Sequence, residues 1–200
     1  MLEELLLATG NAGKVRELRD MLTPLGVRVW TPAERGLHLE VREDADTFEG
    51  NALKKARAFA AASGLPSLAD DSGLEVDALG GAPGVFSARY AGVGATDEAN
   101  RAKLLSALEG VPCEERAARF RCALVLVDAS GTPLFRTHGS CEGRILRRPR
   151  GTGGFGYDPI FAPAGERRSM AELSGAEKNA LSHRGVAVRG LRDWLRSARG

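Results

Sequence analysis

Two adjacent carboxylates and a hydroxyl, Asp70, Asp71 and Ser72, stand between short apolar flanks in the segment LADDSGL (68–74). Successive side chains of a strand point to opposite faces, so one aspartate can face a cleft while its neighbour is held by backbone donors or by a metal. Asp, Ser and Gly are also common turn formers, so the residues DDSG taken alone favour a turn. Whether they form a site depends on the polar residues elsewhere in the chain.

A polar loop between a predicted strand and a predicted helix is a candidate binding site for an anion. The apolar run LLLA (5–8) predicts a buried strand, and the spacing of apolar residues over 15–25 predicts a helix. Between them, TGNAGK (9–14) would direct backbone N–H groups at the helix N-terminus toward an anion. It is not a Walker A loop, which needs glycine where Ala8 stands and Ser or Thr where Val15 stands. A plain connection remains the alternative.

A lysine on the apolar side of a second predicted helix is another candidate. The pattern predicts a helix over residues 47–63, with Thr47 as a possible N-cap and Gly64-Leu65-Pro66 as its end. At helical spacing, Lys55 shares a stripe with Phe48, Asn51, Ala52 and Phe59. An inward ammonium needs a carboxylate, carbonyls or an anionic ligand. The alternative is a lysine at the edge of the stripe whose charged end reaches solvent.

A glycine-rich segment with two aromatic residues follows near the C-terminus. In GTGGFGYDP (151–159), four glycines allow close approach of the backbone, Phe155 and Tyr157 can stack on a planar ring, and Asp158 adds a carboxylate. The alternative is a hairpin loop with two half-buried aromatics. The segments EKN (177–179) and SHRG (182–185) then place a cation, an imidazole and a guanidinium just before the last helix.

The remaining pattern predicts a single mixed α/β domain over residues 1–200. A helix is expected over 96–108, capped by Thr96, and a strand over 119–127, with antiparallel strands over 133–140 and 143–146. The last helix should bury an apolar face formed by Val188, Leu191, Trp194, Leu195 and Ala198.

Composition and charge exclude several classes of protein. The 200 residues are 43% hydrophobic and 27% charged, with a formal net charge of +2, as in an ordinary soluble globular protein. The basic run 144–150 alternates with apolar residues, so an exposed strand edge is favoured over a nucleic-acid patch. The acidic start of the chain does not suit a signal peptide, and no apolar run approaches the ~20 residues of a membrane span. The odd number of cysteines and the scattered histidines suggest neither disulfides nor zinc, so we expect a cytoplasmic protein.

Taken together, the polar segments offer partners for a metal-bound triphosphate, a sugar and a heterocyclic base. The sequence resembles the Ham1-like inosine triphosphate pyrophosphatases, which hydrolyse noncanonical purine nucleoside triphosphates. The resemblance covers nearly the whole chain, through TGNAGK (9–14), TFEGNALKKA (47–56), LADDSGL (68–74), LGGAPGVFSARYAG (79–92), GTGGFGYDPIF (151–161) and AEKNALSHRG (176–185).

The resemblance implies a reaction that needs Mg²⁺ and yields a nucleoside monophosphate and pyrophosphate. Asp71 would accept a proton and bind the metal. The second metal carboxylate of the family falls in VREDAD (41–46), where many relatives have Glu-Glu-Thr-Gly. Because the sequence departs from that pattern, Glu43 is the first choice for the second ligand and Asp44 the alternative.

The resemblance also implies the residues that contact the substrate. Those for the triphosphate are Thr9, Gly10, Asn11, Ala12, Gly13, Lys14 and Lys55, and Ser72 would contact the substrate as well. Those for the base and ribose are Phe155, Gly156, Tyr157 and Asp158. Lys178, His183 and Arg184 would complete the contacts to base and phosphate.

The fold that the resemblance implies is a long, mixed, twisted sheet flanked by helices, with two lobes and a central substrate cleft, in a homodimer. Arg184 carries only hydrogen-bond donors, and the backbone N–H groups of the Ser182-His183-Arg184 loop are likewise donors. Both suit the 6-oxygen of hypoxanthine or xanthine and not the 6-amino group of adenine. We therefore expect preference for inosine and xanthosine triphosphates, deoxy forms included. Two alternatives are a nucleotide sensor without turnover and a relative that acts on other nucleotides, as the Maf-like pyrophosphatases do.

Overall fold

The computed structural model describes residues 2–197 and groups them in two compact units. Unit 1 holds the described residues up to Asp71, Cys122–Gly139 and those from Arg184 onward, and unit 2 holds Ser72–Arg121 and Ser140–His183. The chain passes from one unit to the other four times, after Asp71, Arg121, Gly139 and His183. The first three of these positions lie inside strands. The single domain expected over residues 1–200 stays a prediction.

Six strands form one sheet in the order β2-β1-β3-β4-β5-β6. β1 is parallel to β2 and to β3, whereas β5 is antiparallel to β6, so the sheet is mixed. This confirms the predicted α/β class with a mixed sheet, while the cleft between two lobes stays a prediction. The strands are Glu4–Leu7 (β1), Arg28–Trp30 (β2), Ser67–Val76 (β3), Ala117–Val127 (β4), Pro133–Ile145 (β5) and Phe161–Pro163 (β6).

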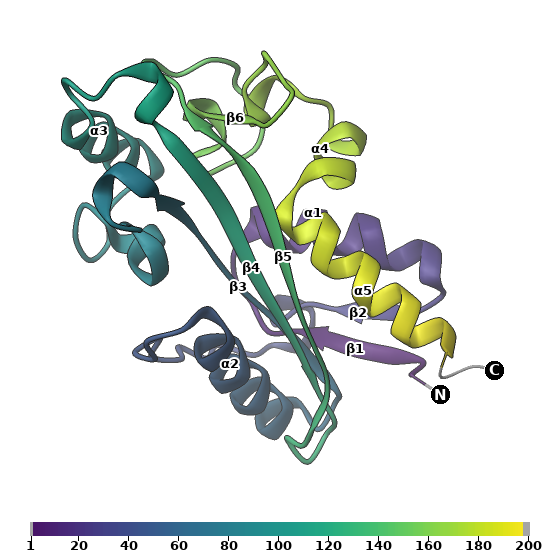
Figure 1. Cartoon of the computed structure of the whole chain (residues 1–200). Coiled ribbons are helices and arrows are strands. Elements are labelled where there is room, and N and C mark those ends of the chain that lie inside the picture. The colour runs from purple at the N-terminus through teal and green to yellow at the C-terminus, as the bar shows by residue number, and fades with distance from the viewer. Residues whose placement is uncertain (1, 198–200) are drawn as a thin grey trace. The chain divides into compact units, whose positions relative to one another are not determined.

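In unit 1, helices cover both faces of the strands. The alternation of side chains divides the apolar residues into two cores: Leu5, Leu7 and Leu68 point one way, whereas Leu6 and Ala69 point the other way. The first core packs against α1 (Ala12–Leu22) and α5 (His183–Ser197), and the second packs against α2 (Phe48–Ser63) (Figure 1). Adjacent residues of β3 therefore face different helices.

Side-chain caps and a glycine set the ends of the unit 1 helices. The Asn11 side chain accepts from the Lys14 N–H, so α1 begins at Ala12, inside the loop predicted from the sequence. Thr47 caps α2 as predicted, by accepting from the Gly50 N–H, and Gly64 ends it in the left-handed conformation at φ 68°. The predicted helix over residues 47–63 is confirmed.

Unit 2 has a core of its own, to which β3 contributes residues after Ser72, β4 residues before Cys122 and β5 residues after Gly139. Leu74, Leu104, Phe120 and Phe161 belong to this core. Two α-helices lie in this unit, α3 (Asp97–Ala107), capped by Thr96 as predicted, and α4 (Gly175–Leu181).

Several local features differ from the sequence predictions. His183 and Arg184, expected just before the last helix, are the first two residues of α5. Residues 70–73 are part of β3, so the turn that DDSG favours taken alone is wrong, because pairing within the sheet outweighs the turn preference of single residues. β5 continues through residues 141–142, where the sequence suggested a break between two strands. The helix α4 was not expected. Ala198, assigned to the apolar face of the last helix, lies outside the described residues, and no helix among residues 2–197 is long and apolar enough to cross a membrane.

Candidate active site

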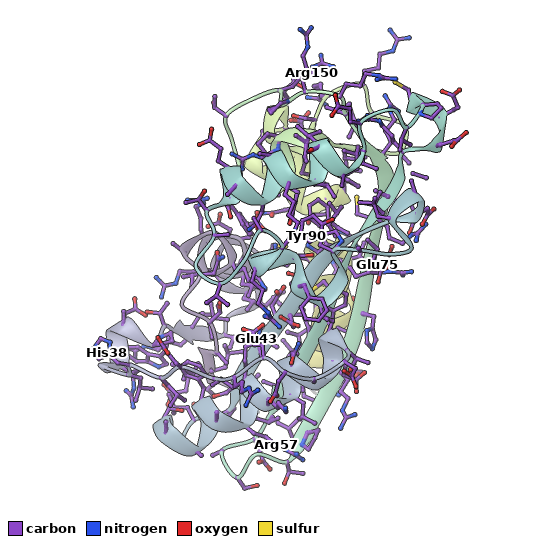
Figure 2. The ribbon with its side chains drawn as sticks, turned by 90° about the vertical axis from the view of Figure 1, so that its left-hand side faces the viewer. His38, Glu43, Arg57, Glu75, Tyr90 and Arg150 are labelled. Atoms are coloured by element: carbon purple, nitrogen blue, oxygen red, sulfur yellow. The ribbon has the colours of Figure 1, made fainter. Side chains whose placement is uncertain are left out.

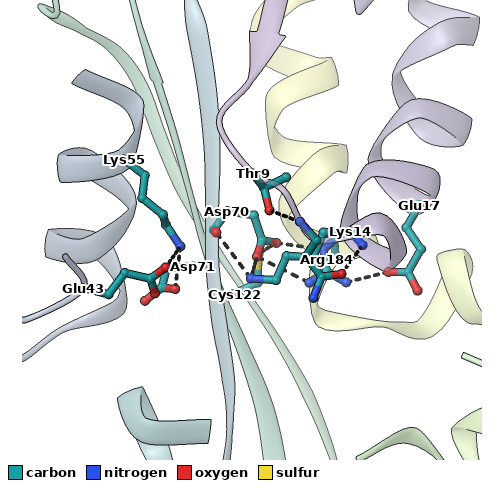
Figure 3. A network of polar contacts seen from close by, with 10 residues as sticks. Thr9, Lys14, Glu17, Glu43, Lys55, Asp70, Asp71, Cys122 and Arg184 are labelled. Atoms are coloured by element: carbon teal, nitrogen blue, oxygen red, sulfur yellow. Dashed lines mark hydrogen bonds and ion pairs between the residues drawn. The ribbon is translucent and has the colours of Figure 1, made fainter. Parts of the chain in front are cut away.

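Two neighbouring aspartates of β3 meet different sets of charged residues. Because side chains alternate along a strand, Asp70 lies on the face covered by α1 and α5, and Asp71 lies on the face covered by α2. Figure 3 shows Lys55 and Glu43 beside Asp71, with Lys14 and Arg184 beside Asp70. The sequence predicted the alternation, and the structure shows what each carboxylate contacts.

The Asp71 cluster consists of Asp71, Lys55 and Glu43. The Lys55 ammonium lies 2.8 Å from Asp71 Oδ1 and 3.3 Å from Glu43 Oε1. Only 9% of the Lys55 side chain is exposed, which confirms the prediction from helical phase that this lysine points inward. The alternative of a lysine that reaches solvent is wrong.

Glu43 comes from the loop before α2, where Figure 2 labels it. Asn51, a buried residue of α2, holds this loop: its Oδ1 accepts from the Ala45 N–H at 2.9 Å, and its Nδ2 donates to the Ala45 carbonyl at 3.5 Å. The helical stripe placed Asn51 inward, but sequence reasoning gave it no role. A buried amide on an otherwise apolar stripe was the signal that could have revealed it.

The charges of the Asp71 cluster shift the pKa of all three groups. Burial raises the pKa of Asp71, the Glu43 charge adds to that shift, and the cations Lys55 and Lys14 do not offset it. Burial also acts to raise the pKa of Glu43, but Lys55, a hydrogen bond with Asp71 and the charge of Lys14 lower it overall. Burial acts to lower the pKa of Lys55, yet the two carboxylates raise it. Asp71 is therefore the carboxylate of the pair that takes up a proton more readily.

The Asp70 cluster consists of Asp70, Lys14, Arg184 and Cys122. Its cations outnumber its carboxylate, unlike those of the Asp71 cluster. The Asp70 side chain is fully buried and lies 2.6 Å from the Lys14 ammonium. It accepts from Arg184 Nε at 2.7 Å and from the Cys122 thiol at 3.1 Å. Burial acts to raise the pKa of Asp70, but Arg184 and Lys14 hold it well below its usual range. Asp70 is thus a buried carboxylate between two cations, which favour its ionised form.

Arg184 is held in this cluster by a residue that sequence reasoning missed. Its guanidinium donates to Asp70 through Nε and Nη2 and to Glu17 Oε2 through Nη1, and its side chain is only 1% exposed. Glu17 is a buried acid on the core-facing side of α1, next to Leu18. A charged residue on an apolar helix face was the available signal. Contact between Arg184 and a substrate stays a prediction.

The loop at the start of α1 is compact. The Asn11 N–H donates to the Thr9 hydroxyl at 3.2 Å, and Asn11 Oδ1 accepts from the Lys14 N–H at 3.0 Å. Gly10 and Asn11 are exposed, while Gly13 is buried in the first turn. The N-terminus of an 11-residue helix, with a lysine in its first turn, therefore opens toward solvent at this loop.

In unit 2, the structure gathers several of the predicted base contacts. Asp158 Oδ2 accepts from the Phe155 N–H at 2.8 Å and also forms an ion pair with Lys178. The Lys178 ammonium lies 4.8 Å from the centre of the Phe155 ring, within the range of a cation–π contact. Phe155 is half-buried, whereas the ring of Tyr157 is buried and its hydroxyl donates to the Ser87 carbonyl. Of the two aromatics, Phe155 is thus the one with ring surface to offer a ligand.

His183 and Ser72 complete the predicted residues of unit 2. The His183 ring stacks on Phe120, with centroids 4.7 Å apart and an interplanar angle of 12°, and it is 5% exposed. Ser72 is half-buried on β3. The predicted residues thus fall into two groups, one in each unit.

The family follows from comparison with known proteins. The sequence model of the Ham1 family matches residues 5–194. The protein belongs to the Ham1 family.

Named relatives support the assignment over nearly the full length. The chain is similar to the dITP/XTP pyrophosphatase of Desulforamulus reducens, with 53% identity over 186 residues, 93% of this chain and 92% of that protein. It is 51% identical to the dITP/XTP pyrophosphatase of Shigella flexneri over 198 residues, 98% of this chain and 100% of that protein. The solved structure of a HAM1 protein from Coxiella burnetii is 44% identical, with a TM-score of 0.87 over 98% of this chain and 100% of the other. The resemblance found in the sequence is confirmed.

The carboxylates of this Ham1 family member fit a magnesium ion that is also bound by water and by substrate phosphates. Among residues 2–197, no group of three or more His, Cys, Asp or Glu side chains could hold a metal by itself. Mg²⁺ is typically bound through one or two carboxylates, with water and substrate phosphates as its other ligands. Asp71 and Glu43, two hard oxygen donors brought together by Lys55, meet that requirement. The site therefore suits a metal that arrives with a phosphate ligand.

Proposed function

We propose that the protein hydrolyses noncanonical purine nucleoside triphosphates (ITP, dITP and XTP) to the monophosphate and pyrophosphate. The observation that carries the proposal is Asp71, a buried carboxylate whose pKa is raised, held between a lysine and a second carboxylate. Such a group can take a proton from water beside a bound metal. The relatives named dITP/XTP pyrophosphatase, at about half identity over nearly the whole chain, support the choice of substrate.

We propose Mg²⁺ as the cofactor, bound by Asp71 and Glu43. When bound, the metal neutralises phosphate charge and lowers the cost of attack by water. The contacts of Asp44 favour Glu43 as the second ligand: Asp44 forms ion pairs with Lys54 and, at 3.2 Å, with Arg42, and both partners lie on the exposed side. Glu43 instead shares Lys55 with Asp71.

The chain's own residues divide the remaining work. Asp71 accepts the proton of a water that attacks the α-phosphorus, which breaks the bond to the β-phosphate and releases pyrophosphate. Lys55, Lys14 and the N-terminus of α1 balance the charge of the triphosphate. Phosphoryl transfer depends mainly on positioning and charge stabilisation, so a site without a protein nucleophile is adequate.

For the base, we propose stacking on Phe155, with discrimination by donors. The structure changes the expected source of those donors, because the Arg184 nitrogens already donate to Asp70 and Glu17. Lys178 is the candidate closest to the proposed stacking ring: its ammonium carries only donors, pairs with Asp158 and lies over the Phe155 ring. A 6-oxygen accepts from such a group, whereas the 6-amino group of adenine meets donor with donor.

The test is a panel of inosine, xanthosine, adenosine and guanosine triphosphates, with Mg²⁺ present, in which pyrophosphate and orthophosphate are measured separately. We expect pyrophosphate from the inosine and xanthosine compounds and a much lower kcat/KM for adenosine triphosphate. Orthophosphate and a diphosphate as first products would contradict the reaction. Binding without turnover would identify a nucleotide sensor, and preference for other nucleotides would place the protein with the Maf-like activities.

We also propose a cytoplasmic homodimer. Two apolar side chains of unit 2 are strongly exposed, Phe86 at 57% and Val93 at 98%, as expected of residues that a second copy covers. The cysteines Cys113, Cys122 and Cys141 are free thiols, which is consistent with a reducing compartment. Light scattering of the purified protein tests the dimer, and Phe86→Ser should shift it toward the monomer.

A further inference from the structure

Gly156, in the glycine-rich loop, forms hydrogen bonds to α3 through both its N–H and its carbonyl. The Gly156 N–H donates to Asp97 Oδ2 at 2.6 Å, and the Gly156 carbonyl accepts from Arg101 Nη1 at 2.7 Å. Asp97 and Arg101 are four residues apart, so they lie on the same face of α3.

The segment that they hold has little structure of its own. Residues 151–157 lie outside the helices and strands, and Gly156 adopts a left-handed conformation at φ 59°, which favours glycine. A segment with four glycines has many accessible conformations, so its shape depends on contacts from outside. The Gly153 N–H donates to the Ala171 carbonyl at 3.1 Å, Asp158 accepts from the Phe155 N–H, and α3 supplies the two contacts to Gly156.

The helix that provides these contacts is itself firmly anchored. Thr96 caps its start, and Leu104 is buried in the core of unit 2. The buried Asn100, between the two charged residues, accepts from the Ala91 N–H at 2.7 Å and donates to the Ala88 carbonyl at 3.2 Å. Asp97 and Arg101 therefore connect an anchored helix to a segment without regular secondary structure.

We propose that Asp97 and Arg101 are positioning residues that fix the plane of the Phe155 ring and thereby set recognition of the purine base. The inference rests on the proposed function, in which the base stacks on Phe155. Both hydrogen bonds involve a charged partner and are of the strong kind. A shift of the Gly156 peptide groups would tilt the adjacent Phe155 and weaken the stack, while the phosphate contacts of unit 1 do not involve α3.

The test compares Asp97→Ala and Arg101→Ala with wild type and with Glu98→Ala, a control that removes an exposed acid next to Asp97 on the same helix. We expect KM for inosine triphosphate to rise about tenfold in both variants, with kcat changed much less. Inhibition by inorganic tripolyphosphate, which lacks a base, should be unchanged. Asp97→Asn, which keeps an acceptor, should restore most of the affinity.

A second measurement does not depend on turnover. Hydrogen exchange of the amides in residues 151–157 should accelerate in both alanine variants and stay as in wild type in Glu98→Ala, with the melting temperature of all three retained within a few degrees. Unchanged exchange, or faster exchange with an unchanged KM, would overturn the proposal. An equal loss of affinity for tripolyphosphate would show a general structural defect and would also overturn it. Failure of wild type to release pyrophosphate, with faster loop exchange in the variants, would instead identify the proposed function as the error.

Discussion

Asp70 and Asp71 are adjacent carboxylates on one strand, and each contacts one lysine at nearly the same distance, 2.6 Å for Lys14 and 2.8 Å for Lys55. Their pKa values nevertheless shift in opposite directions. Burial acts to raise both pKa values. For Asp70 the additional cation Arg184 helps to outweigh burial, whereas for Asp71 the lysines do not outweigh it and the carboxylate Glu43 adds to the rise. A lysine alone thus does not decide whether a buried aspartate is structural or reactive; the balance of all neighbouring charges does.

The largest effect should come from Asp70→Asn, measured as the free energy of unfolding in urea. The substitution leaves Arg184 and Lys14 short of one buried negative charge, and breaking such a pair costs about 3–5 kcal/mol. Asp71→Asn is the matched control, because it changes the same chemical group one residue away. Equal stability of the two variants would contradict the contrast between the two aspartates.

The reverse order should hold for activity. Asp71→Asn removes the proton acceptor and a metal ligand, so we expect turnover of inosine triphosphate to fall by at least ~10²-fold while the fold is retained. Steady-state kinetics and circular dichroism measure the two properties. Turnover within a few-fold of wild type would exclude Asp71 as the base.

Lys55→Met tests the lysine of the Asp71 cluster. Charge-assisted contacts to phosphate are worth enough that kcat/KM should fall about tenfold or more. The neighbouring Lys54→Met is the control, because Lys54 is exposed and pairs with Asp44. The structure adds a further expectation: without Lys55, Asp71 and Glu43 are left with like charge, so the variant should lose some stability at neutral pH.

Addition of Mg²⁺ in the presence of inorganic tripolyphosphate should stabilise the Asp71 cluster beyond the effect of tripolyphosphate alone. At a metal concentration ten times Kd, binding contributes about 1.4 kcal/mol, which raises the melting temperature by a few degrees. The shift should be lost in Glu43→Gln and retained in Asp44→Asn. The opposite pattern would transfer the second ligand from Glu43 to Asp44.

The pH dependence of stability sharpens the comparison further. The raised pKa of Asp71 means that its ionisation opposes folding at neutral pH, and this penalty disappears as pH falls through the raised value. The lowered pKa of Asp70 means that its ionisation favours folding, a contribution lost only in acid, below the ordinary aspartate pKa of about 3.9. Asp71→Asn should therefore gain relative to wild type near pH 7 and lose that gain on mild acidification, as unfolding curves across pH would show.

Much of the fold could be predicted because local patterns carry it. The short run that forms β1 and the stripe of α2 with its Thr47 cap follow from side-chain periodicity and capping chemistry. β3 could not be recognised from DDSG alone, since its extended form depends on pairing with distant strands. The short α4 was missed because seven residues offer little periodic signal.

The candidate site was predictable to a similar degree. Helical phase placed Lys55 inward, and alternation along a strand separated Asp70 from Asp71, both from sequence position alone. Glu17 and Arg184 are 167 residues apart, so their pairing and the resulting commitment of Arg184 to Asp70 could not be inferred. The hydrogen bonds that join Gly156 to Asp97 and Arg101 link residues more than fifty positions apart, so they could not be inferred from the sequence either.

The sequence by itself determined which residue types were available and to which face each must point, because the periods of strand and helix are properties of the local backbone. Only the tertiary structure decided which charges became neighbours, and therefore that one aspartate is held ionised by cations while the next has its pKa raised. The reason is that electrostatic interactions depend on distances through space and on burial, and both are set by segments that meet only after folding.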